Sequence, residues 1–166
     1  MNDFFSKTDL SRKDAEGIIS ETLNKCDDGE LYLESSKSES IVLDDNKIKS
    51  STYNSDLGYG LRAITGEVVA YSHSNEISKD SLKQSSDNLR STLKSKNGFY
   101  NHEIPKTNEK FYKEVNPIEE KLLQSKLELL KEVNSYTRAK SGIVQQVTAS
   151  LAGEHKSIEI IRSGGE

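Results

Sequence analysis

The sequence contains three histidines and one cysteine, which are the residue types that most often take part in catalysis or metal binding. They are Cys26, His73, His102 and His155. His102 precedes Glu103, as in zinc-protease motifs, which need a second histidine one helical turn later. Lys106 and Thr107 occupy those positions instead, and Pro105 disfavours a helix there. The sequence therefore excludes this motif at His102.

The other candidates lack the neighbours that would activate them. His73 ends an expected strand and His155 lies in an expected turn, and neither has a partner at metal-ligand spacing. Cys26 lies on an apolar helical stripe, where a buried and inert thiol is expected. Glu119 and Glu120 fall in the first turn of an expected helix, where the macrodipole favours carboxylates. We therefore expect no catalytic and no metal-binding residue in this chain, and the roles of the three histidines stay open.

Composition narrows the class of protein. The chain has 166 residues, with 23 Lys and Arg against 27 Asp and Glu. This acidic balance argues against nucleic-acid binding. Residues 79–96 form the most basic stretch, which is either a solvated helix face or a phosphate-binding face. An apolar content of 33% and a mean hydropathy of −0.72 predict one domain or two small ones, with a small core or a core left incomplete.

The cellular compartment is predicted from three features that the sequence lacks: a possible intramolecular disulfide, a membrane span and a signal peptide. A single cysteine cannot form an intramolecular disulfide, which favours a reducing compartment. The sequence holds no apolar run near the roughly 18 residues that a membrane helix needs. The first seven residues do not resemble a signal peptide. We expect a cytoplasmic protein without a membrane span.

Residues 1–98 predict an N-terminal α+β domain that consists of a helix, an antiparallel β-meander and a second helix. The first helix is expected over 10–26 with Ser11 in its capping box, and the second over 79–96 with Ser78 as its cap. Asn97-Gly98 is expected to end the second helix. Short strands are expected at residues 31–33, 41–43, 48, 57–64 and 68–71, with turns at 44–47 and 65–67.

Residues 99–116 are expected to form an extended linker, and residues 117–166 to begin a second α+β domain. Asn116 and Pro117 are typical of a helix start, and an apolar face continues to Tyr136. A hairpin should follow, with strands at 143–151 and 158–161 and a connection at 152–156. One helix and one hairpin cannot bury both apolar faces, so this unit either packs on the first or continues in further chain.

Gly58 and Gly60 fall on one face of an expected strand. Glycines at this spacing indicate a bulge, a sharp bend or a close approach of another backbone. A structural role within the sheet is the leading interpretation, and an approaching second chain is the alternative.

Four sequence blocks, in order, resemble the TldD/PmbA metallopeptidase family. They are residues 30–36 (ELYLESS), 41–49 (IVLDDNKIK), 58–67 (GYGLRAITGE) and 147–153 (VTASLAG). The first three are similar to the family's N-terminal domain, and the fourth is similar to the start of its middle domain on the TldD side. One departure is Val68-Val69 before Ala70-Tyr71, where the family more often has Gly-Phe. This departure leaves the strand pattern intact.

The resemblance implies a cytoplasmic, zinc-dependent peptidase in which a TldD-type subunit pairs with a PmbA-type subunit or with itself. It also implies extended peptides as substrates. In the family the metal is held by a His-Glu-x-x-x-His motif, which no residue of this chain matches, so no catalytic or metal residue is transferred. This chain is then expected to supply walls of the substrate chamber and part of the subunit interface. A strand edge between residues 41 and 72 could pair with an extended peptide.

Two other interpretations stay open. The chain could be a non-catalytic scaffold module that binds peptides or proteins and keeps only the front part of the family fold. A small nucleic-acid-binding α+β domain is the third interpretation, and the acidic balance disfavours it. Residues 158–166 end in mid-pattern, which favours a truncated sequence of a longer peptidase over a complete scaffold.

Overall fold

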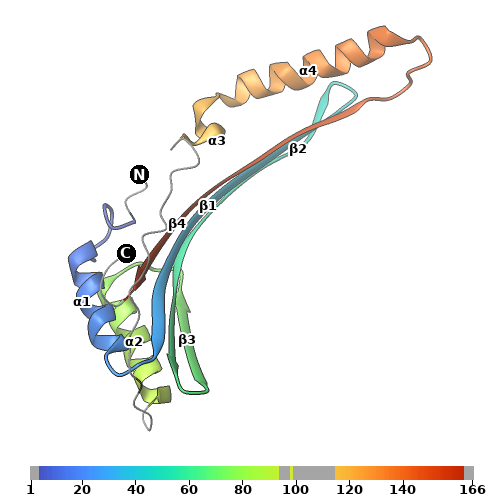
Figure 1. Ribbon diagram of the computed structural model, residues 1–166. Coiled ribbons are helices and arrows are strands. Elements are labelled where there is room, and N and C mark those ends of the chain that lie inside the picture. Colours follow the sequence, from blue (N-terminus) through green and yellow to red (C-terminus); the bar gives the residue numbers. More distant parts are fainter. Residues whose placement is uncertain (1–3, 94–97, 99–114, 163–166) are drawn as a thin grey trace. The chain divides into compact units, whose positions relative to one another are not determined.

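Helices and strands follow one another in the order expected of an α+β chain (Figure 1). The computed structural model describes residues 4–93, 98 and 115–162. Its elements are α1 (Arg12–Leu23), β1 (Asp28–Asp44), β2 (Lys47–Thr65), β3 (Val68–Ser74), α2 (Lys79–Leu93), α3 (Pro117–Glu120), α4 (Leu123–Lys140) and β4 (Thr148–Arg162). The strands form one four-stranded sheet in the order β3-β2-β1-β4. The predicted α+β class is confirmed.

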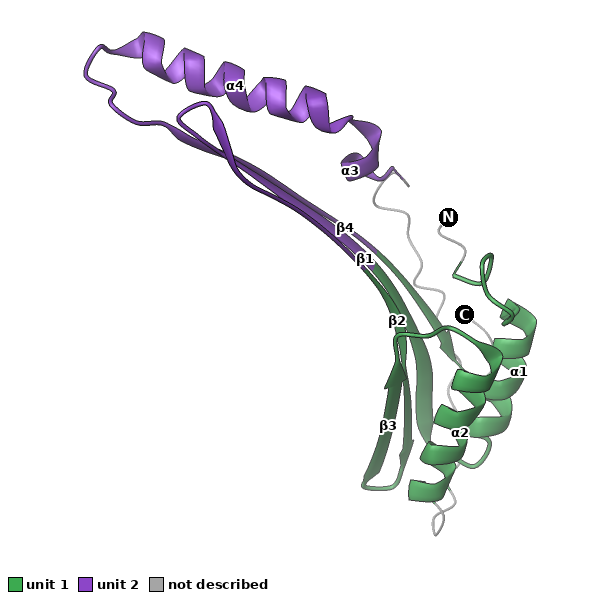
Figure 2. Ribbon diagram, turned by 180° about the vertical axis from the view of Figure 1, so that it is seen from behind, with its two compact units in different colours: residues 1–35, 56–111, 157–166 green, residues 36–55, 112–156 purple. Residues whose placement is uncertain are grey.

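The chain folds into two compact units whose segments alternate along the sequence (Figure 2). Unit 1 contains residues 1–35, 56–111 and 157–166, and unit 2 contains residues 36–55 and 112–156. Strands β1, β2 and β4 therefore each contribute residues to both units. The predicted division into independent domains at 98 and 117 stays a prediction.

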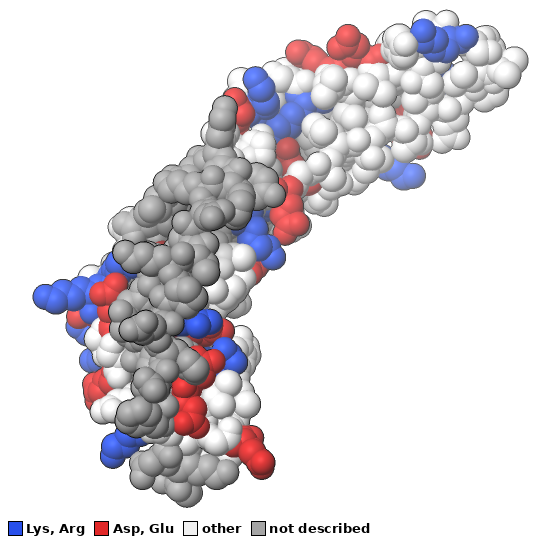
Figure 3. Space-filling model, viewed as in Figure 1, with Lys and Arg blue, Asp and Glu red and all other residues white. Residues whose placement is uncertain are grey.

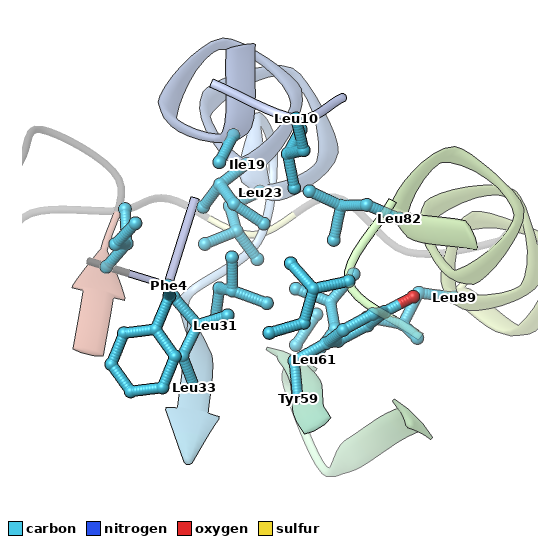
Figure 4. Packing of buried hydrophobic residues seen from close by; sticks show 14 of the residues in the cluster. Phe4, Leu10, Ile19, Leu23, Leu31, Leu33, Tyr59, Leu61, Leu82 and Leu89 are labelled. Atoms are coloured by element: carbon cyan, nitrogen blue, oxygen red, sulfur yellow. The ribbon is translucent and has the colours of Figure 1, made fainter. Parts of the chain in front are cut away.

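Unit 1 places α1 and α2 on one face of its part of the sheet, around a well-buried core (Figure 4). Its largest buried side chains point toward one another from both helices and from β1 and β2; they include Leu10, Ile19, Leu23, Leu31, Leu33, Tyr59, Leu61, Leu82 and Leu89. β2 and β3 pair antiparallel, with Leu61 opposite Ser72. Every second residue of β2 from Tyr59 to Thr65 is buried, because alternate side chains of a strand face the same side.

The predicted helix caps are present in unit 1. The Ser11 side chain accepts a hydrogen bond from the backbone N–H of Asp14 at 3.1 Å. Ser78 Oγ accepts one from the backbone N–H of Ser81 at 3.2 Å. Each bond satisfies an N–H at the start of a helix that has no partner within the helix. Asn97, which was expected to end α2, lies outside the described residues.

Unit 2 consists of the hairpin end of β1 and β2, the start of β4, and the helices α3 and α4. Its small core joins Leu130 of α4 to the strand residues Ile41, Leu43 and Ala149. Asp45 and Asn46 form the hairpin turn with φ values of +46° and +65°. Two successive residues with positive φ are typical of the type I′ turn that joins tightly paired strands. The predicted turn at 44–47 is confirmed.

All four strands are longer than the sequence predicts. The runs expected at 31–33 and 41–43 belong to one strand, β1, and those at 48 and 57–64 belong to β2. The hairpin expected over 143–161 is wrong, because residues 148–162 form the single strand β4 with no turn at 152–156. The strands continue through polar residues because backbone pairing needs no apolar side chain, whereas the prediction depended on apolar alternation.

The helix expected from Asn116 to Tyr136 is broken in two. Asn116 caps α3 as predicted, since its Oδ1 accepts the Ile118 N–H at 3.0 Å. The backbone of Lys121 is then extended, with φ −111° and ψ +134°. In a continuous helix the Ile118 carbonyl would accept the N–H of Leu122. Here that carbonyl accepts a hydrogen bond from Lys126 Nζ at 2.6 Å instead.

Close contacts within unit 1 leave no room for a side chain at Gly58, and leave room at Gly60 only if the exposed Tyr71 side chain moves. A Cβ on Gly58 would lie 2.7 Å from the Ser74 carbonyl oxygen, and one on Gly60 would lie 2.5 Å from the hydroxyl of Tyr71. Both neighbours belong to β3, the strand paired with β2. The structural interpretation of these glycines is therefore supported, and the approaching chain is the protein's own β3.

Candidate functional site

The two histidines among the described residues, His73 and His155, belong to different units. His73 lies exposed on β3, where its ring stacks on Tyr71 with 5.9 Å between centroids. His155 lies on β4 and belongs to the other unit, and His102 falls outside the described residues. Within residues 4–93, 98 and 115–162, no three His, Cys, Asp or Glu side chains gather closely enough to hold a metal ion.

Cys26 is buried, as its place on the apolar stripe predicts. Burial raises the pKa of the thiol, because an apolar environment disfavours the charged thiolate. Its Sγ lies 3.8 Å from the Thr22 carbonyl oxygen. A thiol held in its neutral form is a poor nucleophile, which fits a structural role for this residue.

The first candidate surface is an open strand edge in unit 2, residues 47–55 of β2. β3 pairs with β2 only from Tyr59 onward. Among the described residues, no other strand pairs with this edge. Every residue from 47 to 55 is exposed, on both faces of the strand. The backbone along this edge is therefore accessible to another chain. Such an edge presents unpaired N–H and C=O groups to which another extended chain can bond.

The second candidate surface is a groove of about 550 Å³ in unit 2. It lies among α3, α4, β1 and β4, and its walls are Glu39, Pro117, Ile118, Lys121, Ser125, Lys126, Leu129, Leu151, Ala152 and Gly153. Most of these side chains are apolar, and Gly153 leaves one part of the wall without a side chain. A mostly apolar concavity with a few charged groups is typical of a binding site.

One wall of the groove holds a buried ion pair. Lys126 Nζ lies 2.6 Å from Glu39 Oε1, and the two side chains are only 9% and 13% exposed. The same ammonium donates to the Ile118 carbonyl. A buried ammonium needs such partners, because leaving water costs a charge several kcal/mol. Lys121, at the same groove, has no ion-pair partner among the described residues.

Sequence reasoning missed this pair. Lys126 falls four residues after Leu122 and four before Leu130, within the apolar face that the helix pattern predicted. A lysine at such a position indicates a buried cation that needs a carboxylate partner. That signal was present, but the identity of the partner required the fold.

Hydrogen bonds connect the tip of the β1–β2 hairpin to Arg138 of α4 and to residues 146–148, which follow that helix. Asp45 Oδ1 accepts from Arg138 and from the Val147 backbone N–H. Asp44 Oδ1 accepts from Gln146 at 2.9 Å and from Thr148 at 2.8 Å. These two hydrogen bonds favour the ionised carboxylate and lower the pKa of Asp44 below its ordinary value of 3.8.

This arrangement predicts an acid-sensitive contribution to stability. Since the pKa of Asp44 is lower in the folded chain than in the unfolded chain, its stabilisation is present above about pH 4 and is lost as the pH falls through the folded pKa. Asp44→Asn should therefore reduce the loss of stability on acidification. Urea midpoints compared at pH 6 and pH 3 for both proteins test this, and an equal loss in the two would contradict it.

Charges of both signs are mixed on the face of the molecule seen in Figure 3. In the basic stretch at 79–96, Lys79 pairs with Asp14 and Arg90 pairs with Glu21. These partners favour the solvated helix face over a phosphate-binding face. None of the helices in the described part of the chain is long and apolar enough to cross a membrane.

Comparison with known families finds a match for the N-terminal part of the chain. Residues 29–94 match the model of the PmbA/TldA metallopeptidase domain 1. The chain is also similar to two proteins named as metalloprotease TldD homologues. The one from Buchnera aphidicola (from Acyrthosiphon pisum) is 36% identical over 140 residues, which cover 84% of this chain and 29% of the relative. The one from Haemophilus influenzae is 30% identical over 145 residues, covering 84% and 30%. The chain thus spans about 30% of the length of these relatives.

Solved structures show the same fold at low sequence identity. A Bacteroides thetaiotaomicron protein, whose name links it to modulation of DNA gyrase, superposes with a TM-score of 0.66 and 19% identity, over 93% of this chain and 37% of its own. TldE from Thermococcus kodakarensis superposes with a TM-score of 0.58 and 15% identity, over 92% and 35%. At these identities the likeness concerns the fold alone.

Proposed function

Since the chain belongs to the PmbA/TldD metallopeptidase family, we propose that it forms the substrate-chamber wall and part of the subunit interface of a TldD-type peptidase. The observation that carries this proposal is the open edge of β2 at residues 47–55. An extended peptide can bind such an edge through main-chain hydrogen bonds that do not depend on its sequence. The reaction of the whole peptidase is hydrolysis of peptide bonds.

The edge suits a substrate that is bound through its backbone, without recognition of its individual side chains. Most residues of the edge are polar, Ile48 and Tyr53 being the exceptions, and it carries Lys47 and Lys49 near its hairpin end. Charged edge residues such as lysine discourage uncontrolled pairing between copies of a protein. A single peptide strand can still add to the remaining residues, 50–55, which are uncharged and exposed.

Zinc would belong to the whole peptidase and not to the residues described here. His73 and His155 lie in different units, and Cys26 is buried with a raised pKa, so these side chains do not fit a zinc site. We derive no catalytic step from them. The hydrolytic chemistry would come from parts of the peptidase outside this chain.

The proposal includes a partner subunit of PmbA type or a second copy of the chain, and a cytoplasmic location. The fold likeness to the TldE structure from Thermococcus kodakarensis supports a shared fold for such subunits. The competing proposal, a scaffold that binds proteins or peptides without any peptidase, is also compatible with the open edge. The two differ in whether the peptide bound at the edge is later cut by an associated subunit.

Photo-crosslinking tests the edge directly. An unstructured ten-residue peptide with a photoreactive phenylalanine analogue is mixed with the chain, irradiated and mapped by mass spectrometry. We expect crosslinks to fall between residues 41 and 72. Because main-chain bonds hold the peptide, a version N-methylated at alternate residues should lose most of them. Absence of crosslinks in that range would overturn the proposed substrate contact.

A further inference from the structure

Tyr53 is the aromatic residue on the open edge of β2, and its side chain is 52% exposed. Its hydroxyl donates a hydrogen bond to Glu119 Oε1 of α3 at 3.5 Å. The ammonium of Lys37, on β1, pairs with the same carboxylate oxygen. All three residues belong to unit 2. Tyr53 therefore lies on the face of the sheet where α3 is found, and its hydroxyl contacts a carboxylate that β1 also binds.

Small side chains flank Tyr53 along the edge. Side chains on one face of a strand recur at every second residue, so Ser51 and Ser55 share the face of Tyr53. Both serines are exposed. The ring is therefore flanked by two short hydroxyl side chains. A strand added to this edge would place one of its side chains beside the ring and the next ones on that face beside serines.

Backbone pairing alone does not determine where along the edge a peptide lies. Main-chain donors and acceptors repeat along a strand, and an exposed strand with polar side chains on both faces specifies register weakly. A pair formed by an aromatic ring and a β-branched or aromatic side chain across two strands stabilises one alignment over the others. Among residues 47–55 only Tyr53 supplies a ring. Tyr53 is therefore the residue of this edge that is best suited to set the register.

We propose that Tyr53 selects a β-branched or aromatic side chain at one position of the bound peptide and thereby fixes the register of that peptide on the β2 edge. This inference rests on the proposed function, and it adds one side-chain contact to binding that otherwise uses the backbone. Charge does not decide the selection, because Lys37 and Glu119 neutralise each other beside the ring. The favoured substrates are extended peptides that carry an apolar residue of this kind among polar ones.

Ile48 is the other large apolar residue of the edge, and it is also 52% exposed. It is the second residue of β2 and closely follows the turn at residues 45–46. A peptide centred on Ile48 would extend past this turn, where the strand has no further residues to pair with it. Tyr53 has residues 47–52 of the strand on its hairpin side, so a peptide centred there keeps its main-chain hydrogen bonds. We therefore assign the selection to Tyr53.

Competition between two peptides tests the selection. Both are ten-residue chains of serine, threonine and asparagine with a small diazirine on the N-terminus, and they differ only at the sixth residue, which is isoleucine or serine. One of them is labelled with heavy isotopes, and equal amounts are mixed with the whole chain, irradiated and mapped by mass spectrometry. We expect the isoleucine peptide to be captured about threefold more often. Its crosslinks should fall at one place on the chain, whereas those of the serine peptide should spread.

Variants of the chain assign the preference to the ring. Tyr53→Ala should bring the two peptides to equal capture and should spread the crosslinks of both. Tyr53→Phe keeps the ring and removes only the hydroxyl, so it should retain the preference. Ile48→Ala is the matched control, and it should change neither the ratio nor the position of the crosslinks. Both side chains are about half exposed, so the substitutions should leave the chain folded, which circular dichroism checks.

Three results would overturn this inference and leave the proposed function intact. One is equal capture of the two peptides, with crosslinks between residues 41 and 72. Another is a preference for isoleucine that survives in Tyr53→Ala. The third is an arginine at the sixth residue that outcompetes isoleucine, which would show that Glu119 attracts a cation instead. Absence of crosslinks between residues 41 and 72 with every peptide would contradict the proposed function itself, and this inference with it.

Discussion

Glu39→Ala should destabilise the chain by about 3 to 5 kcal/mol, because it leaves the buried ammonium of Lys126 without its carboxylate. The Ile118 carbonyl remains as a hydrogen-bond acceptor, but it carries no full charge to offset that of the ammonium. Urea unfolding followed by circular dichroism measures the change. The same substitution at Glu128, which is exposed on α4, should cost less than about 0.5 kcal/mol.

A double variant distinguishes charge from packing. Glu39→Leu with Lys126→Met replaces both ions by apolar side chains of similar size, and the pair should then be about as stable as the original chain. Each single variant should remain strongly destabilised. If Glu39→Ala and the double variant unfold at the same urea concentration, the loss comes from packing around Glu39 and the account of a buried ion pair is wrong.

Leu61→Ala should cost about 2 to 5 kcal/mol by leaving a cavity in the core of unit 1. Leu61 is 0% exposed and packs among side chains from both helices, as Figure 4 shows. Partial collapse of the neighbours decides where in that range the value falls. The change in the free energy of unfolding is obtained from urea or thermal denaturation.

Leu57→Ala is the matched control, since it removes the same atoms from the same strand. Leu57 is 45% exposed, so most of its surface already contacts water. Its substitution should cost less than about 1 kcal/mol. Similar losses for Leu57→Ala and Leu61→Ala would contradict the burial that places the core on the helix-covered face of β2.

The sequence predicted the elements of unit 1 well because local signals and burial agree there. Ser11 and Ser78 cap helices whose apolar residues face alternating apolar residues of the strands, so each pattern supports the next. In unit 2, the turn at Asp45 and Asn46 was also predictable, from residues that tolerate positive φ.

Unit 2 was predicted less well because its structure depends on contacts between distant residues. β4 runs through Gly153 and His155, which resemble turn residues in isolation, and backbone pairing with the sheet keeps them extended. The break between α3 and α4 likewise depends on Lys126, whose ammonium takes the Ile118 carbonyl that a continuous helix would use. Neither groove nor open edge could be located before the order of the strands was known.

The proposed role in a peptidase rests most directly on where an extended peptide contacts the chain. In the photo-crosslinking experiment, the account predicts that crosslinks concentrate between residues 41 and 72, on the open edge at 47–55, and that N-methylation of alternate peptide residues removes them. Crosslinks that fall elsewhere, or that persist with the N-methylated peptide, would contradict the claim that this edge of β2 holds substrate by backbone pairing.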